Sequence, residues 1–378
     1  MEIKNRLLNI DLPKGKSAFL WGPRQVGKSY WIRSHLPQAI VIDFLKTDIF
    51  ADYISRPSLL RERYADTKQI IVIDEVQKIP DILDEVHWLI ENKHCAFLLT
   101  GSSARKLRHG HANLLGGRAW RYTMTPLCSR EIDDMVLDTV LISGLLPAFI
   151  QSPEPKQELR SYVADYLKEE IAAEAIVQNI PAFADFLRIA AITSGELLNY
   201  TNIASECGVS AKVIRSYFQI LEDTLLGFRL QPWRKAIDRR LIETEKFYLF
   251  DIGVTNYLAN RTPGYGTPEY GKSFEHFILM EFRAYQAYRN PELPIYYWRT
   301  HSGIEVDFIL GQMEIAIEIK TSKRIVEGHL KGLKALQEEN KVKRAILVSF
   351  ETEPKILNGI ECLHWTDFLA QLWEGAII

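Results

Sequence analysis

The sequence is poor in cysteine and has no long apolar segment. Its 378 residues include only four cysteines, with no CxxC pair and no histidine cluster at metal-ligand spacing. We therefore expect reduced thiols and no structural zinc site. No apolar run approaches the ~20 residues that a membrane span requires, and the N-terminal residues lack the apolar stretch of a signal peptide. Together these absences predict a cytoplasmic protein without a membrane partner.

An excess of charge of one sign is also missing. The chain has 46 Lys and Arg residues against 48 Asp and Glu residues, which gives a formal net charge of −2. This balance excludes a protein that coats nucleic acid through overall basicity, but it permits a basic patch on one domain. The hydrophobic share of 47% is typical of a globular protein, and the length predicts two or three domains.

The first specific pattern lies near the N-terminus. The apolar run SAFLW predicts a buried strand, SYWIRSHL predicts a helix, and GPRQVGKS between them has the G-x-x-x-x-G-K-[ST] spacing of a P-loop. In such a loop, backbone N–H groups point at a phosphate and the helix N-terminus adds its positive end. Lys28 would reach the β- and γ-phosphates of ATP, and Ser29 would ligate Mg²⁺. The predicted ATP-binding residues of this stretch are Gly22, Pro23, Arg24, Gln25, Val26, Gly27, Lys28, Ser29 and Tyr30.

An acidic pair follows the next strand signal. The β-branched run Ile70–Ile73 predicts a strand buried on both faces, and Asp74 and Glu75 close it. We expect Asp74 to bind Mg²⁺ through its water shell and Glu75 to polarise the attacking water. Helix-length segments separate the predicted strands, which indicates a parallel sheet. These strands are expected at 39–44, 69–74 and 95–100.

Further residues are assigned to the nucleotide. Ser102 follows the third strand and is predicted to act as a polar sensor of the γ-phosphate or water, with an ordinary turn as the alternative. Arg118 is predicted to contact the nucleotide, and either Arg118 or Arg121 would serve as an arginine finger. Arg24 could instead contact phosphate from within the loop, and a surface cation is the alternative for each arginine. The finger is therefore left unassigned.

The sequence pattern changes near residue 150, where a predicted proline-rich turn is followed by a segment with a helical pattern. Ala204, Gly208 and Ile214 then take the positions of the small residue, the turn glycine and the buried branched residue of a helix-turn-helix. Ser210 is the expected N-cap of its second helix. The predicted domains are 1–150, 151–240 and 241–378.

Cations near this motif predict contacts with DNA phosphates. The second helix would present Lys212, Arg215 and Gln219 outward. A basic segment near a predicted wing follows, and a module that only packs against protein is the alternative. The cations of that segment are Arg229, Arg234, Lys235, Arg239 and Arg240.

Two strands of the last third, GIEVDFIL and MEIAIEIK, form a predicted hairpin around Gly311-Gln312. With a two-residue loop, Asp307 would pair with Ala316 and lie diagonal to Glu318. Two carboxylates this close repel unless a cation intervenes, so we expect Mg²⁺ at Asp307 and Glu318. Lys320 would orient water or stabilise charge on a phosphate. A charged face of an exposed sheet is the alternative.

This D…ExK arrangement resembles the core of the PD-(D/E)xK nucleases. The resemblance implies an acidic residue from the preceding helix, for which Glu275 is the first choice and Glu281 the second. The predicted catalytic residues of the whole chain are Lys28, Glu75, Glu275, Asp307, Glu318 and Lys320.

The order of parts resembles a family of predicted AAA-type ATPases, related to the STAND and archaeal-ATPase branches. The stretches GPRQVGKS, IVIDEVQKIPDI, LTGSSARKL and EVDFIL…AIEIK carry the resemblance. It implies an α/β chain with a P-loop NTPase parallel-sheet domain, a helical winged-helix segment and an α/β restriction-endonuclease-like domain. It also implies Mg²⁺-dependent ATP hydrolysis, with DNA as the expected partner. The sequence leaves open whether the chain forms a homo-oligomer. The alternatives are an ATP-operated regulatory switch or a protein-remodelling ATPase whose nuclease-like domain is inactive.

Overall fold

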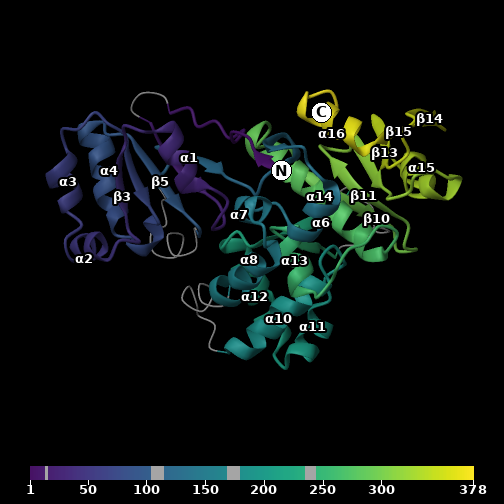
Figure 1. The fold of residues 1–378 in the computed structure, drawn as a ribbon, viewed down its shortest axis with the longest axis horizontal. Coiled ribbons are helices and arrows are strands. Elements are labelled where there is room, and N and C mark those ends of the chain that lie inside the picture. The colour runs from purple at the N-terminus through teal and green to yellow at the C-terminus, as the bar shows by residue number, and fades with distance from the viewer. Residues whose placement is uncertain (13–15, 104–114, 168–178, 235–243) are drawn as a thin grey trace. The chain divides into compact units, whose positions relative to one another are not determined.

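The computed structural model describes residues 1–12, 16–103, 115–167, 179–234 and 244–378 (Figure 1). No helix within these ranges is both long and apolar enough to cross a membrane. The predicted wing cations Lys235, Arg239 and Arg240 lie outside the described residues.

The chain divides into two compact units. The P-loop unit contains Asn5–Leu127 and Gln219–Leu226, and the C-terminal unit contains Met1–Lys4, Cys128–Phe218 and Gly227–Ile378. The predicted boundaries at 150 and 240 differ from this division, because the segment after Cys128 packs with later elements. Asn256 Nδ2, for example, donates to the carbonyl of Leu141 at 2.8 Å. The division into three domains stays a prediction.

A five-stranded parallel sheet forms the centre of the P-loop unit, in the order β3-β4-β5-β2-β6. Its central strands are buried along their length, as their apolar runs predict. The strands are β2 (Ser17–Trp21), β3 (Ile40–Asp43), β4 (Ile71–Asp74), β5 (Phe97–Gly101) and β6 (Ala119–Thr123). The helices are α1 (Lys28–His35), α2 (Thr47–Ser55), α3 (Leu59–Tyr64) and α4 (Ile82–Lys93), with the 3-10 turn η1 (Val76–Lys78).

Helices dominate the first part of the C-terminal unit. The predicted helix-turn-helix is found as α11 and α12, with Gly208 between them at φ 64° and Ile214 fully buried. The N–H of Val213 donates to Ser210 Oγ at 3.4 Å, as expected for an N-cap. The helices are α6 (Leu137–Ser143), α7 (Pro147–Gln151), α8 (Pro155–Ser161), the π-helical η3 (Tyr162–Leu167), α10 (Ile180–Ile192), α11 (Tyr200–Cys207), α12 (Ala211–Asp223) and α13 (Ile252–Leu258).

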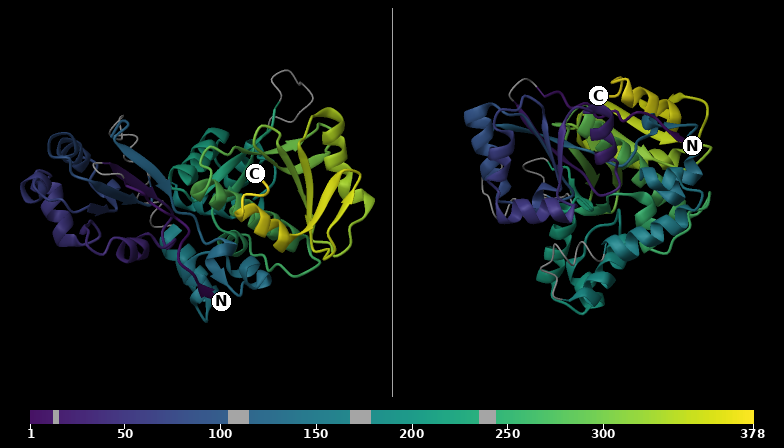
Figure 2. Two further views of the ribbon diagram at one scale, coloured as in Figure 1. Left: turned by 90° about the horizontal axis from the view of Figure 1, so that it is seen from above. Right: turned by 60° about the vertical axis from the view of Figure 1, so that its left-hand side comes forward.

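A mixed eight-stranded sheet completes this unit, in the order β14-β15-β13-β12-β11-β10-β8-β9. Helix α16 packs on β13 and β15, as Figure 2 shows in yellow. The strands are β8 (Gly227–Pro232), β9 (Lys246–Leu249), β10 (Ile295–Arg299), β11 (Glu305–Leu310), β12 (Ile315–Ile319), β13 (Arg344–Ser349), β14 (Lys355–Leu357) and β15 (Ile360–His364). Its other elements are α14 (Pro268–Tyr288), η4 (Glu327–Leu330), α15 (Lys331–Glu339), α16 (Trp365–Trp373) and, outside the sheet, the turn η2 (Ser129–Glu131) with the paired short strands β1 (Glu2–Ile3) and β7 (Ile132–Asp133).

The register of the β11–β12 hairpin differs from the prediction by two residues. Phe308 pairs with Ile317 and Ile309 with Ala316, so Asp307 lies directly opposite Glu318 instead of diagonal to it. The connection has four residues rather than two, because Gly311 and Met313 both take left-handed backbone conformations there. A shift of two residues leaves every side chain on its predicted face.

Helix α15 covers the sheet face that alternation assigns to Asp307. Ile309 and Ala316 are buried in one cluster with Leu333 and Leu336 of that helix. The opposite face meets α14, where the ring of Phe308 lies 5.4 Å from that of Phe282. Asp307 and Glu318 therefore lie at one end of two neighbouring strands whose faces are both buried.

Candidate functional site

The P-loop lies at the carboxyl end of β2, and glycine is required at both of its ends. Gly27 has φ 101°, a conformation that other residues rarely adopt. A Cβ on Gly22 would lie 2.6 Å from the carbonyl oxygen of Met124. Arg6 supports the loop from the chain before β2, donating to the carbonyls of Val26 at 2.7 Å and Thr125 at 2.6 Å.

Lys28 is buried inside this loop. Its ammonium donates to the carbonyls of Gly22 at 2.5 Å and Pro23 at 2.9 Å. Burial lowers the pKa of Lys28 to about 8, against the opposing effect of the Glu75 and Asp74 carboxylates. The ammonium is thus held where the loop would surround a phosphate, and its partners in the loop are neutral carbonyls.

Asp74 joins the P-loop to the neighbouring strands. Ser29 Oγ donates to Asp74 Oδ2 at 3.1 Å, and the hydroxyl of Thr100 at the end of β5 donates to Asp74 Oδ1. A hydroxyl beside a carboxylate at a helix N-terminus provides the oxygen ligands that Mg²⁺ prefers.

Glu75 follows directly and has a left-handed backbone with φ 58°. Gln77 Nε2 and Ser102 Oγ, the latter at 3.3 Å, both donate to Glu75 Oε2. Ser102 therefore contacts the predicted base, whereas its contact with phosphate stays a prediction. Because Gln77 also donates to Ser102 at 3.2 Å, the three side chains form one buried hydrogen-bonded group.

The other predicted nucleotide contacts differ in position. Arg24 is half-buried within the loop, while the Tyr30 side chain is 67% exposed on α1. Arg118 precedes β6 and pairs with Glu91, at the edge of the sheet opposite the P-loop. The length of β6, about 16 Å at ~3.3 Å per residue, separates the two edges. Arg118 therefore lies away from the P-loop of its own chain, and its contact with nucleotide stays a prediction.

The predicted nuclease-like residues come together at the end of the second sheet. We call Glu275, Glu305, Asp307 and Glu318 the carboxylate cluster. Asp307 Oδ2 accepts a hydrogen bond from the N–H of Ile319 at 2.7 Å, and Lys320 forms an ion pair with Glu318. Burial raises the pKa of Asp307 well above its usual range, and the nearby Glu318 and Glu275 carboxylates add to the shift.

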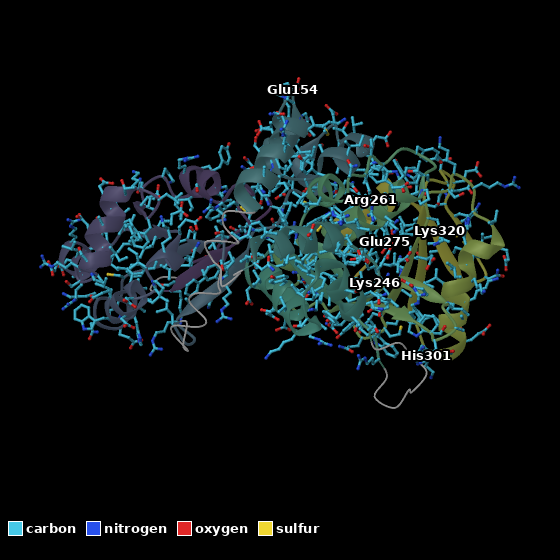
Figure 3. The ribbon with its side chains drawn as sticks, turned by 90° about the horizontal axis from the view of Figure 1, so that it is seen from below. Glu154, Lys246, Arg261, Glu275, His301 and Lys320 are labelled. Carbon is cyan, nitrogen blue, oxygen red and sulfur yellow. The ribbon has the colours of Figure 1, made fainter. Side chains whose placement is uncertain are left out.

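An unpredicted ammonium also belongs to this cluster. Lys246 of β9 has a side chain only 4% exposed, forms an ion pair with Glu305 and lies 3.8 Å from Glu275. Figure 3 shows Lys246, Glu275 and Lys320 in this part of the sheet. Burial by itself would lower the pKa of Lys246, but the Glu275, Glu305 and Asp307 carboxylates outweigh it and hold the pKa above its usual value.

The residues of the carboxylate cluster do not fit Mg²⁺ well as they stand. Glu318 Oε2 is buried and has no hydrogen-bond partner among the described residues, which favours a cation. However, ammonium groups already pair with Glu305 and Glu318, and Tyr248 donates to Glu275 at 2.6 Å. Within the described parts of the chain, no group of three or more His, Cys, Asp or Glu side chains could hold a metal ion. Mg²⁺ at Asp307 and Glu318 stays a prediction.

Glu281, the second choice for the acidic residue of the helix, lies in a different environment. It accepts hydrogen bonds from the N–H of Ser129 at 2.7 Å, from the Ser129 hydroxyl at 2.8 Å and from Trp373 Nε1 at 2.7 Å. Burial raises the pKa of Glu281 to about 7. These contacts connect α14 to η2 and α16, so Glu281 is a packing residue.

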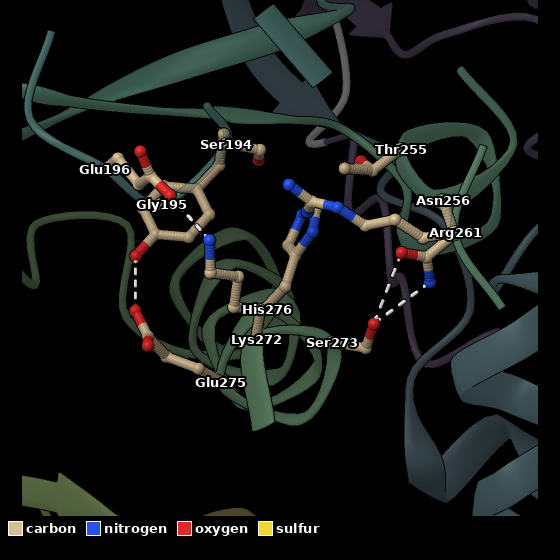
Figure 4. Close-up of a pocket in the computed structure, with 11 residues that line it drawn as sticks. Ser194, Gly195, Glu196, Thr255, Asn256, Arg261, Lys272, Ser273, Glu275 and His276 are labelled. Carbon is tan, nitrogen blue, oxygen red and sulfur yellow. Dashed lines mark hydrogen bonds and ion pairs between the residues drawn. The ribbon is translucent and has the colours of Figure 1, made fainter. Parts of the chain in front are cut away.

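A pocket of about 80 Å³ adjoins the carboxylate cluster, with Glu275 and Tyr248 in its wall. Figure 4 shows Lys272 reaching Glu196 across it, an ion pair of 2.5 Å, while Arg261 enters from the side near His276. The pocket therefore shares Glu275 with the carboxylate cluster.

Sequence reasoning missed Thr100, Gln77, Arg6 and Lys246. Thr100 and Gln77 lie next to recognised motifs, one at the end of a predicted strand and the other two residues after Glu75. Their positions could have indicated a role. Arg6 and Lys246 lie far from their partners in the sequence, and no local pattern marks them.

Comparison with known proteins identifies the first part of the chain. A family profile described as an AAA domain matches residues 14–133. Residues 14–133 are an AAA domain. Two further profiles, each described as a domain of unknown function, match residues 135–264 and 270–368, after the AAA domain. Neither description names an activity, and neither names a nuclease.

Similar whole proteins add no function. The uncharacterized proteins Rv2008c of Mycobacterium tuberculosis and Mb2031c of Mycobacterium bovis are each 29% identical over 308 residues, covering 78% of this chain and 68% of theirs. Among solved structures, the chain is similar to the Aeropyrum pernix ORC1 protein, solved in complex with DNA. That similarity has 12% identity and a TM-score of 0.26, and it covers 65% of this chain and 86% of the other. A TM-score this low does not indicate a shared overall fold.

Proposed function

We propose that this protein binds and hydrolyses Mg²⁺-ATP in its AAA domain and uses the nucleotide cycle to control DNA binding by its helix-turn-helix. The convergence of Lys28, Ser29, Asp74 and Glu75 at one edge of a parallel sheet carries the proposal. Ligands of such sheets bind at the carboxyl ends of the strands.

The AAA domain contains candidate residues for binding phosphate, binding the metal ion and activating water. The P-loop amides and Lys28 would hold the phosphates, and Ser29 and Asp74 would hold Mg²⁺. When bound, the metal ion supplies neutralisation of the charge that develops on the phosphates. Glu75 would accept a proton from the attacking water, with Gln77 and Ser102 fixing its carboxylate.

DNA binding is supported by the exposed face of α12. Lys212, Arg215 and Gln219 are exposed there, and the Arg215 guanidinium lies 4.7 Å from the ring centre of Tyr200. The end of this helix belongs to the P-loop unit, where Leu225 packs against the core and Ser103 Oγ donates to the carbonyl of Asp223 at 3.5 Å. Ser103 directly follows the sensor position Ser102, so a change at the nucleotide can reach the helix.

The test is ATP turnover measured with and without DNA, together with DNA affinity measured with and without a non-hydrolysable ATP analogue. We expect DNA to change turnover and the analogue to change DNA affinity, because two linked sites influence each other reciprocally. ATP turnover that no form of DNA changes would contradict the coupling. It would favour a regulatory switch that binds a protein partner. Nucleotide-dependent oligomers in light scattering without DNA would favour a protein-remodelling ATPase.

DNA cleavage is a second candidate function: Asp307 lying opposite Glu318 on adjacent strands favours it, whereas the ammonium groups already paired with the carboxylate cluster oppose it. Supercoiled, linear, branched and single-stranded DNA incubated with Mg²⁺ or Mn²⁺ would test it. Nicking that disappears in Asp307→Ala and Lys320→Ala would support cleavage. If the DNA stays intact in every case, cleavage is contradicted and a purely structural role of this domain is favoured.

A further inference from the structure

We propose that Lys246 is the resident cation of the carboxylate cluster and excludes a divalent metal ion from it. The inference concerns the C-terminal unit alone, so it stands or falls separately from the proposed ATPase.

The contacts of Lys246 place its ammonium among carboxylates. It pairs with Glu305, lies 3.8 Å from Glu275 and is 5.2 Å from the ring centre of Tyr297. A side chain exposed to only 4% has little access to water, so its charge depends on these partners.

The carboxylate cluster and the cations paired with it need no divalent ion to balance their charge. Besides the four carboxylates, the group contains the cations of Lys246, Lys320 and Arg299, and Arg299 pairs with Glu305. The net charge is therefore close to zero, and adding two positive charges would make the buried group cationic. Mg²⁺ also demands near-octahedral oxygen coordination, which ammonium groups on these oxygens obstruct.

One feature of the cluster is nevertheless suited to a metal ion. Glu318 Oε2 is buried and finds no hydrogen-bond partner in the part of the chain that the structure describes, and Asp307 lies directly across from Glu318. Removing the Lys246 charge would leave the carboxylates in excess while keeping these two in place. The vacated position would adjoin the pocket of Figure 4 through Glu275, which lines that pocket and lies 3.8 Å from the Lys246 ammonium.

The strand that carries Lys246 belongs to the segment next to the helix-turn-helix. β9 pairs antiparallel with β8, which directly follows α12 in the chain. The Lys246 ammonium that pairs with the carboxylate cluster therefore comes from outside the strands β10, β11 and β12, of which β11 and β12 carry Asp307 and Glu318. Without β9, the carboxylate cluster would lack the Lys246 ammonium, so this strand explains how the D…ExK pattern occurs here without a fitting metal site.

The experiment measures Mn²⁺ binding to the full chain without nucleotide, by the loss of the free-ion signal in electron paramagnetic resonance. We expect Lys246→Met to gain one Mn²⁺ site at least about tenfold tighter than any in the wild type, and Lys246→Met with Asp307→Asn to lose it. Lys272→Met, which removes an ammonium from the adjacent pocket, is the matched control and should gain nothing. Mn²⁺ should also raise the melting temperature of Lys246→Met and leave that of the wild type unchanged, since only binding to the folded state stabilises it.

Two results would overturn the proposal. The first is a wild-type protein that takes up Mn²⁺ at a site lost in Asp307→Asn, a measurement that does not depend on how Lys246→Met folds. The second is a folded Lys246→Met protein that binds no additional Mn²⁺. In either case ATP turnover would be measured in parallel, so a failure of this inference is distinguishable from a failure of the proposed function.

Discussion

The hydroxyl of Ser29 donates a hydrogen bond of 3.1 Å to Asp74 Oδ2 and so joins two segments that lie 45 residues apart in the sequence. Ser29 belongs to the first turn of α1, and Asp74 is the last residue of β4. Both predicted Mg²⁺ ligands are thus held together at the mouth of the P-loop.

Lys28 and Glu75 should fail in different ways. Lys28→Ala should lose tight ATP binding, because the charge that meets the phosphates is gone. Glu75→Gln should keep ATP affinity within about twofold and lower turnover by about a hundredfold or more, because an amide accepts no proton from water. Fluorescent-nucleotide binding and phosphate release measure the two effects. Lys16→Ala, at an exposed position before β2, is the control, and unchanged hydrolysis in both test variants would remove the ATPase assignment.

Gln77 is predicted to position Glu75 without touching substrate. Gln77→Leu should lower kcat by about tenfold and leave the KM for ATP nearly unchanged, because a donor to Glu75 Oε2 is lost. Steady-state kinetics separates the two constants. The same substitution at the exposed Gln69 should change neither, and a rise in KM with constant kcat would show that Gln77 serves binding instead.

Arg118 should be dispensable for nucleotide binding. Its position at the opposite edge of the sheet predicts an ATP dissociation constant for Arg118→Ala within about twofold of the wild type. Equilibrium dialysis with ATP tests this. A large loss of affinity at high dilution would contradict the expected geometry, whereas a loss of turnover only at high protein concentration would reveal a finger that acts on a neighbouring copy.

The exposed face of α12 predicts a salt-dependent contact with DNA. Lys212→Ala and Arg215→Ala should each weaken DNA binding and reduce the slope of log K against log salt concentration by about 1. Fluorescence anisotropy over a range of salt concentrations measures the slope. Lys334→Ala, on α15, is the control, and equal slopes for all variants would exclude this face as the DNA contact.

Glu281 predicts a specific dependence of stability on pH. Folding raises the pKa of the Glu281 carboxyl from 4.5 to about 7. Between pH 4.5 and pH 7 the folded state therefore binds more protons than the unfolded state. Stability contributed by this group is therefore present at low pH and falls as pH rises from about 4.5 to 7, by up to about 3 kcal/mol. Urea unfolding at several pH values should show this slope in the wild type.

The control for that slope is Glu281→Gln, which has no proton to release. Its free energy of unfolding is expected to lack the Glu281 contribution, so the difference between wild type and variant should change steadily from pH 4.5 to 7. A constant difference over this range would show that the Glu281 carboxyl is not perturbed as described.

The nucleotide edge could be predicted from sequence to a large extent. The P-loop spacing and the acidic strand end are local patterns, and strand, turn and helix follow one another within a few residues. Neighbouring strands of a parallel sheet bring their carboxyl ends together, so Lys28, Ser29, Asp74 and Glu75 meet without further information. The sequence left the position of Arg118 open, because a turn residue can lie at either edge of a sheet.

The carboxylate cluster was predictable only in part. Alternation placed Asp307 and Glu318 on one face, but a loop longer by two residues set their actual pairing. Glu275 and Glu281 lie on the same helix, and only packing shows that one meets Tyr248 and the other meets Ser129 and Trp373.

The sequence by itself determined which residues are predicted to carry phosphate and acid–base chemistry, because each of those motifs is confined to a few consecutive positions. Only the tertiary structure decided which charges neutralise one another, because Lys246 reaches Glu305 across 59 residues of chain and no local pattern encodes that meeting. Burial makes this pairing important, because a charge removed from water is stabilised only by the groups that the fold places beside it.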